Sequence, residues 1–226
     1  MERPTEGSPI DKGTYRSKVY AYLRERIIAG VLLPGEAITL RGLSKELGVS
    51  VAPVREALVQ LESEQVILRR DNRDYRVNTV SRREFDEICR IRRMIEPYLG
   101  ERACRRRPES AVEVAAGTLE AMREARGDPK RFVALNHDLH FGIYACADYP
   151  ILLGIVSGLW ARIGPYLTIN LPSQNLGEDL ELHAGMVDAF RRKDATAFNR
   201  DLLADIDFSY GYVAPMLDGQ PTGDGT

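Results

Sequence analysis

The chain has 226 residues, of which 44% are hydrophobic and 28% charged, so its composition is that of an ordinary globular protein with one large or two small domains. Its three cysteines lie far apart, which excludes a disulfide framework and a zinc-ribbon spacing. The net charge of −2 is unevenly spread, because residues 14–83 carry +5 and residues 84–226 carry −6. Chance variation in composition is the alternative, but a basic front half and an acidic back half fit a protein that binds a polyanion through its front half only.

The N-terminus lacks the apolar segment of a signal peptide, and residues 1–13 are predicted to form a flexible arm. The longest apolar run, Ile151 to Ala161, is interrupted by glycines and is too short to span a bilayer. We therefore expect a cytoplasmic protein without a membrane segment.

Three short helices are predicted in the front half, over residues 15–29, 39–47 and 51–63. Gly30 and Gly48 follow the first two, in the position that glycine favours after a helix. Ser50 is expected to cap the third helix through its hydroxyl, with Pro53 in the first turn. Apolar residues around 66–68 and 75–77, with a polar turn between them, predict a β-hairpin.

The third helix has two distinct faces. Val54, Ala57, Leu58 and Leu61 recur at helical spacing and form an apolar side. The opposite side carries Val51, Ala52, Arg55 and Gln60, which are free to meet a partner. A short, braced helix with an arginine near its N-terminal end suits the major groove of DNA. Residues 14–79 are thus predicted to form a winged helix-turn-helix.

The back half is predicted to be entirely helical. Ser81 and Glu84 form a capping box that opens a long helix. Helices are expected at about 82–106, 109–126, 129–147, 150–169, 177–193 and 195–213. The fold class is mainly α: a winged helix-turn-helix over residues 14–79, an antiparallel bundle of about six helices over 80–216, and a disordered tail over 217–226.

Polar residues interrupt the apolar stripes of four of these helices. They are Arg92, Asn136, His140, His183 and Asp205. Since a buried charge is costly without a partner, several on facing stripes predict a polar cavity within the bundle. Asn136 and His140 share one helix face, and His183 and Asp205 would complete a mixed nitrogen and oxygen metal site. An ordinary hydrogen-bonded core network is the alternative.

The segment PGEAITLRGLSKELGVSVAPVREALVQLESEQVI resembles the N-terminal domain of GntR-type transcriptional regulators. The helical remainder, with IRRMIEPYLGERA, Asn136–His140 and Glu181–His183, resembles the ligand-binding FCD domain of the FadR branch. The resemblance spans about residues 15–212. It implies a homodimer on a palindromic operator that responds to a small molecule, and in many members a divalent metal held by an Asp and three His.

The sequence departs from that family pattern at several positions. Val51 stands where the family usually has a DNA-contacting arginine, whereas Arg41 and Arg55 match contacting positions. Asp74 replaces a glycine of the wing. Asn136 stands for the usual Asp ligand and Asp205 for the last His, while His140 and His183 match. These changes favour a different metal, such as Zn, Ni or Mn, or none.

We therefore expect a ligand-responsive, sequence-specific DNA-binding regulator, a repressor rather than an enzyme. The residues expected to contact DNA are Arg41, Ser50, Val51, Ala52, Arg55, Arg70, Arg73 and Arg76. The residues expected to bind a small anionic metabolite, such as a carboxylate, are Arg92, Asn136, His140, His183 and Asp205. Two alternatives stay open: a helical metal-dependent enzyme, and an interaction module that has lost DNA binding.

Overall fold

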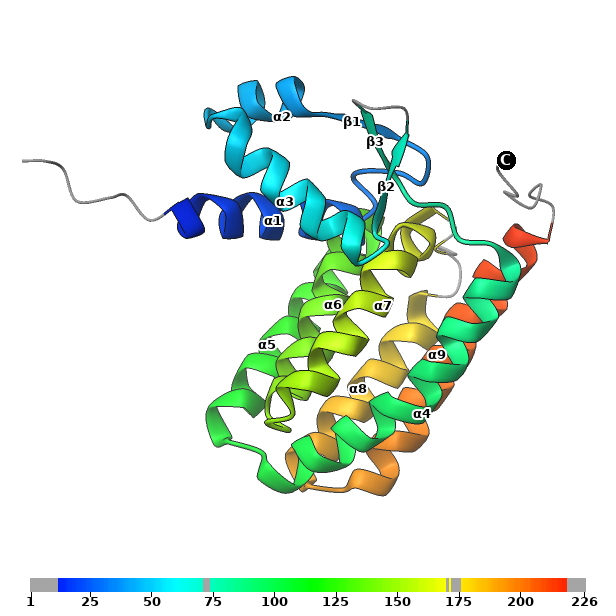
Figure 1. Ribbon diagram of the computed structural model, residues 1–226. Coiled ribbons are helices and arrows are strands. Elements are labelled where there is room, and N and C mark those ends of the chain that lie inside the picture. Colours follow the sequence, from blue (N-terminus) through cyan, green and yellow to red (C-terminus); the bar gives the residue numbers. More distant parts are fainter. Residues whose placement is uncertain (1–11, 71–73, 170, 172–175, 219–226) are drawn as a thin grey trace, which may run out of the picture.

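The computed structural model describes residues 12–70, 74–169, 171 and 176–218, with the side chains of 12–14 excepted. Its first part contains three helices and a small sheet (Figure 1). The helices are α1 (Lys12–Ile28), α2 (Leu40–Leu47) and α3 (Val51–Ser63), and the strands are β1 (Ala37–Thr39), β2 (Ile67–Arg70) and β3 (Asp74–Val77). Residues 1–11 of the expected arm, most of the expected tail and Arg73 lie outside the described residues. The last two residues of the expected arm, 12 and 13, instead begin α1, and residue 217 of the expected tail ends α9.

The sheet has the order β1-β3-β2 and is antiparallel throughout. Strand β1 was not predicted from the sequence, because three residues are too few to show an alternating pattern. The hairpin strands are also longer than expected: Arg69 and Arg70 belong to β2 and Asp74 to β3, although all three were placed in the turn. The hairpin is the wing of the predicted winged helix-turn-helix.

The ends of α2 and α3 follow from their local sequence. Thr39 caps α2 by accepting a hydrogen bond from the Gly42 amide at 3.1 Å, and Gly48 ends it in the left-handed conformation with φ 64°. The expected hydroxyl cap of α3 is wrong, because Ser50 makes no side-chain cap bond. Pro53 occupies the third helical position and so removes one of the two amide hydrogens that a capping hydroxyl can accept.

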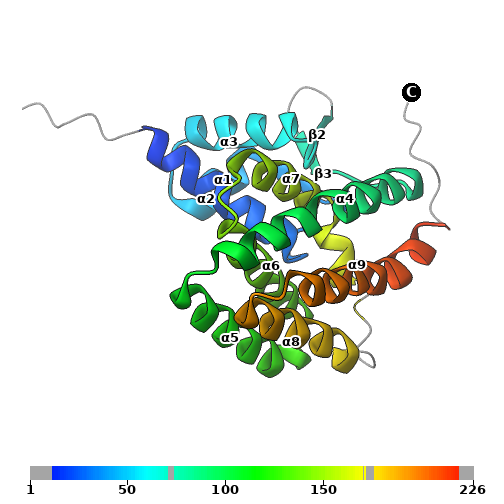
Figure 2. The same cartoon turned by 90° about the horizontal axis from the view of Figure 1, so that it is seen from below.

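Six helices follow in the second part of the described chain. They are α4 (Arg82–Arg106), α5 (Glu109–Glu124), α6 (Pro129–Ala145), α7 (Pro150–Ile169), α8 (Leu176–Arg192) and α9 (Ala195–Leu217). Contacts run in the order α4, α9, α8, α5, α6, α7 and back to α4, so the helices enclose a common interior (Figures 1 and 2). The predicted capping box is confirmed: the Ser81 amide donates to Glu84 at 2.9 Å, and the Ser81 hydroxyl accepts from the Glu84 amide.

The two parts have separate hydrophobic cores, and α1 joins them by lying against α7 (Figure 1). Gly164 of α7 allows a backbone contact here, because a Cβ at this position would lie 2.6 Å from the carbonyl oxygen of Ile28. Gly30, with φ 61°, lies against the side chain of Thr168, where a Cβ would come within 2.6 Å of the Thr168 Cβ. Ala161 of α7 belongs to the core of the first part. The helix is therefore a wall shared by both parts.

Helix α7 is longer than the apolar run considered in the sequence. By length and composition alone this 20-residue helix could cross a membrane, with a mean hydropathy of 1.3. In the structure, 44% of its most apolar window is buried, and it packs against α1, α4 and α6. The apolar run Ile151 to Ala161 is thus part of a longer helix, which packs against other helices of the described chain.

Candidate DNA-binding face and buried polar site

A basic groove lies between α2, α3 and the wing. It has a volume of about 560 Å³, and arginines from three elements line it: Arg41 from α2, Arg55 from α3 and Arg69 from β2. All three are exposed. Arg41 and Arg55 make no hydrogen bond or ion pair with another residue of the described chain, so their guanidinium groups are available to an anion or a base edge.

Arg69 was missed by the sequence reasoning, which chose Arg70, Arg73 and Arg76 in the wing. Arg69 pairs across the strands with Tyr75, whereas Arg70 pairs with Asp74. Because side chains alternate along a strand, Arg69 and Arg70 point to opposite faces of the wing. Tyr75 and Val77, two residues apart, define the inner face of β3. This spacing could have indicated in advance that Arg69, which pairs with Tyr75, lies on the same face of the hairpin. Arg76 donates to the Gly35 carbonyl at 2.9 Å, which fastens it to the loop before β1.

The start of α3 presents the other residues expected at DNA. Ser50, Val51 and Ala52 are exposed, and 36% of Val51 is accessible to solvent. They lie one turn before Arg55, while the opposite face of the helix, with Val54 and Leu58, is completely buried. Asp74 is exposed and lines the groove, so a carboxylate accompanies the three arginines there.

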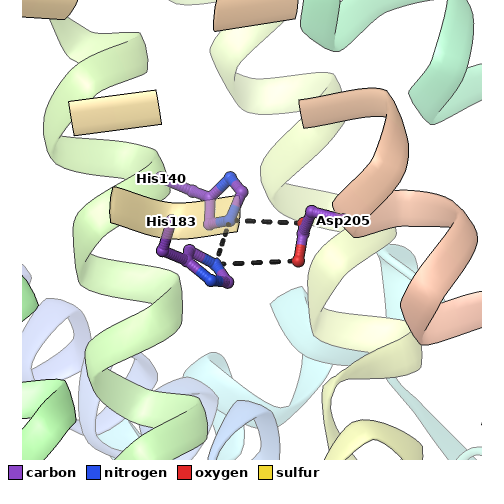
Figure 3. Close-up of side chains that lie close together, drawn as sticks. All are labelled: His140, His183 and Asp205. Atoms are coloured by element: carbon purple, nitrogen blue, oxygen red, sulfur yellow. Dashed lines mark hydrogen bonds and ion pairs between the residues drawn. The ribbon is translucent and has the colours of Figure 1, made fainter. Parts of the chain in front are cut away.

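The bundle interior holds a second polar cluster, which brings together four residues singled out in the sequence. Nε2 of His140 (α6) and Nε2 of His183 (α8) are 3.1 Å apart, and Asp205 (α9) lies 3.5 Å from the first and 3.6 Å from the second (Figure 3). Asn136 Oδ1 lies 3.0 Å from His183 Nε2. Both imidazoles are fully buried.

The hydrogen bonds on the far side of each ring fix which nitrogen carries the proton. Nδ1 of His183 is 2.6 Å from the Asp179 carbonyl, which can only accept. Nδ1 of His140 is 3.1 Å from the Tyr144 hydroxyl, whose hydrogen is donated to Glu96 at 2.8 Å. Both rings therefore carry hydrogen on Nδ1, and in the neutral rings both Nε2 lone pairs face Asp205, and that of His183 also faces the Asn136 oxygen.

Such convergence of lone pairs is unfavourable unless a proton or a cation lies between them. Burial lowers the pKa of His140 well below its ordinary value, and His183 lowers it further. Burial also opposes the charged form of His183, but Asp179 and Asp205 outweigh burial and raise its pKa. Burial raises the pKa of Asp205 as well. A protonated His183 or a bound cation would each relieve the repulsion among these acceptors.

A divalent metal fits the donor set. Ligand atoms about 2.0–2.2 Å from one ion lie roughly 3.0–3.5 Å from each other at the usual bond angles. Four of the separations among these donors match that range to within about 0.1 Å: the one between the two imidazoles, the one from each imidazole to Asp205, and the one from His183 to Asn136. His140, His183 and Asp205 also form the three-residue group whose ligand atoms all lie within 4.8 Å of one another.

Asp179 was not chosen from the sequence, which pointed instead to Glu181 in the Glu181–His183 motif. Glu181 is exposed, whereas Asp179 is buried beside His183 because it lies four residues earlier on the same helix face. Burial raises the pKa of Asp179 to about 7, and the nearby charge of Asp205 raises it as well. The helical spacing of four from His183 was the signal that could have found it.

Arg92 is buried as expected, but it has a partner within its own helix. Its Nε donates to Glu96 at 2.7 Å, and its guanidinium lies 4.5 Å from the centre of the Trp160 ring. Trp160 and Tyr144 also donate to Glu96, at 2.9 and 2.8 Å. Glu96 was not singled out from the sequence. Nη1 of Arg92 has no partner in the described chain.

Comparison with known proteins now identifies the class of this chain. Residues 15–77 match the family model of the bacterial regulatory proteins of the gntR family, and residues 87–207 match the FCD domain. The chain belongs to the GntR family of transcriptional regulators with an FCD domain. The fold class predicted from the sequence is confirmed, as is the preference for a regulator over an enzyme.

Individual relatives agree with this assignment. The chain is 30% identical over 177 residues to the HTH-type transcriptional regulator McbR of Escherichia coli (strain K12), covering 76% of this chain and 80% of McbR. It is 25% identical to the gluconate operon transcriptional repressor of Bacillus licheniformis, covering 88% and 85% of the two chains. The solved structure of E. coli McbR/YncC superposes with a TM-score of 0.84 at 26% identity, covering 89% of this chain and 98% of that one.

Proposed function

We propose that the chain is a cytoplasmic transcriptional repressor of the FadR branch, which binds a palindromic operator as a homodimer and responds to a small anionic metabolite. The main support for the proposed DNA-binding face is the basic groove lined by Arg41, Arg55 and Arg69. We place the DNA-binding domain at residues 14–79 and the effector domain at 80–216. The start of α3 enters the major groove, and the wing arginines contact phosphates.

Selection from a pool of random duplexes tests this proposal. The purified protein should enrich one sequence with two related halves, and its affinity for that sequence should exceed that for random duplex about 10³-fold or more. Because arginines would neutralise phosphates, affinity should fall steeply as salt rises. Equal affinity for the enriched pool and for random duplex would overturn the proposal.

The effector domain is proposed to hold a divalent metal, Zn, Ni or Mn, through His140, His183, Asp205 and the Asn136 amide oxygen. The spacing of the four donors and the orientation of both Nε2 lone pairs support this. Such an ion attracts carboxylates when it keeps open positions. The chain's own contribution is the orientation of the two imidazoles, by the Asp179 carbonyl and by Tyr144.

Elemental analysis and equilibrium dialysis of the purified protein test the metal site. We expect about one ion per chain, and loss of that ion in His140→Gln and His183→Gln. His137→Ala is the control, because His137 stacks on Phe141 outside the cluster. Circular dichroism checks that each variant is folded. Failure of folded wild-type protein to bind any of the three metals would contradict the proposal, and the interior would then be a hydrogen-bonded network.

Arg92 is proposed to bind the effector anion through Nη1, the donor that Glu96 leaves unused. Thermal denaturation in the presence of a set of organic acids tests this, because a ligand of the native state raises the midpoint. Arg92→Lys keeps the positive charge beside Glu96 but removes the guanidinium fork, so the shift caused by a binding acid should shrink. An unchanged shift would remove Arg92 from the effector site.

A further inference from the structure

The first turn of α3 exposes two aliphatic side chains, Val51 and Ala52. Neither belongs to the core, which this helix joins through Val54, Ala57, Leu58 and Leu61. Val51 is 36% accessible, and Ala52 is exposed beside it. Arg55 follows one turn later and lines the basic groove. The leading end of the helix is therefore apolar, and its first cation comes only in the second turn.

This arrangement limits what the helix can recognise. The side chains of Val51 and Ala52 have no hydrogen-bond donor or acceptor, so they cannot pair with the polar edges of guanine, adenine or cytosine. The thymine C5 methyl is the one apolar group that the four standard bases present in the major groove. Against guanine or cytosine, the same side chains would cover polar atoms without bonding to them, which is unfavourable.

We propose that Val51 and Ala52 read thymine methyl groups, and that the operator carries thymine in each half-site beneath the start of α3. Arg55 lies 4 positions from Val51 on the same side of the helix and contacts the neighbouring base edge or phosphate. This inference rests on the proposed DNA-binding function. Isolated exposed aliphatic residues are common on protein surfaces, so the test must separate recognition from mere exposure.

Substitution of deoxyuridine for thymine gives that test. Deoxyuridine lacks only the methyl group and keeps its base pairing. In the selected operator, each thymine is replaced in turn, symmetrically in both halves, and the dissociation constant is measured. Loss of one buried methyl contact weakens binding about fourfold, so a symmetric pair should weaken it roughly 10- to 20-fold. At least one thymine position in each half should show this loss.

A mutant cycle assigns the loss to Val51. Val51→Ala should weaken binding to the thymine operator and should be nearly indifferent to deoxyuridine at the same position. Val114→Ala is the matched control, because Val114 is 65% exposed on α5, away from the groove. That variant should lose as much affinity as wild type when deoxyuridine replaces thymine (the deoxyuridine penalty). Both substitutions replace an exposed residue within a helix, so neither should prevent folding.

The outcomes distinguish this inference from the function on which it rests. If selection enriches no operator, the DNA-binding proposal fails and the inference falls with it. If an operator is found but wild-type binding is insensitive to deoxyuridine at every thymine, methyl recognition is wrong while the regulator remains. An equal deoxyuridine penalty in Val51→Ala and in wild type at every position would overturn the role of Val51.

Discussion

The winged domain and the helical bundle use arginine in opposite ways. In the winged domain, Arg41 and Arg55 are exposed and have no partner in the described chain. In the bundle, Arg92 is 1% exposed and paired with Glu96, which is completely buried. The first arrangement leaves charge available for an outside anion. The second arrangement pairs the Arg92 guanidinium with a carboxylate inside the protein and leaves only its Nη1 without a hydrogen-bond partner in the described chain.

This contrast shows that the same side chain has a different energetic role in each region. An exposed guanidinium is hydrated in the free protein, so its removal should affect binding and leave folding nearly unchanged. A buried guanidinium depends on its carboxylate, because either charge alone in the interior is strongly unfavourable. Substitutions on the two sides should therefore separate into binding variants and stability variants.

Glu96→Gln should have the largest effect, on stability. Glu96 accepts hydrogen bonds from Arg92, Tyr144 and Trp160, and the amide would leave the Arg92 charge uncompensated. We expect a loss of about 3–5 kcal/mol in the free energy of unfolding, measured in urea. Glu120→Gln is the control, because the Glu120–Arg123 pair is exposed and its loss should cost less than about 1 kcal/mol. Equal effects of the two substitutions would remove the distinction between the regions.

Arg55→Ala should have the next largest effect, on operator affinity. Loss of a base-reading arginine should cost about 1–3 kcal/mol, measured by gel shift or fluorescence anisotropy. Its urea midpoint should stay close to that of wild type, since Arg55 packs outward. Arg126→Ala, which alters an exposed arginine of the bundle, should change neither quantity. A destabilised Arg55→Ala variant with normal affinity would reverse the comparison.

Two cap residues should show the smallest effects and sharpen the comparison within the winged domain. Thr39→Ala removes the hydroxyl that caps α2 and should cost about 1 kcal/mol of stability. Ser50→Ala should cost less than about 0.5 kcal/mol, because Ser50 makes no cap bond. If Ser50 holds a phosphate, the second substitution should instead weaken operator binding. A larger stability loss for Ser50→Ala than for Thr39→Ala would contradict the geometry described for the two helix ends.

Local rules predicted most of the fold. The capping box at Ser81, the glycine after α2 and the apolar spacing of α3 each depend on residues within one or two turns, so the sequence alone defines these elements. Strand β1 was missed because its pairing with β3 joins segments far apart in the chain. The predicted cap at Ser50 was wrong, and Pro53 contributes to this because it removes one of the two amide hydrogens that the hydroxyl could accept.

The sequence identified which polar residues line the interior of the bundle, but it did not identify the partner of Arg92. Spacing placed His140, His183 and Asp205 on inward faces, and the structure brings them together. The partner of Arg92 was not foreseen, since the sequence pattern did not single out Glu96. Helix orientation within a bundle depends on the packing of all its neighbours, which periodicity along one helix does not specify.

Helix α7 has a mechanical consequence for how the two regions communicate. On its inner side, Trp160 donates to Glu96 beside Arg92, and on its outer side Gly164 touches the backbone of α1. A contact without an intervening side chain has no rotamer that can absorb movement. A ligand that displaces α7 by a few tenths of an ångström must therefore shift α1 or open this seam, and a shift of α1 reaches α3, the helix proposed to enter the major groove, because α1 packs against it.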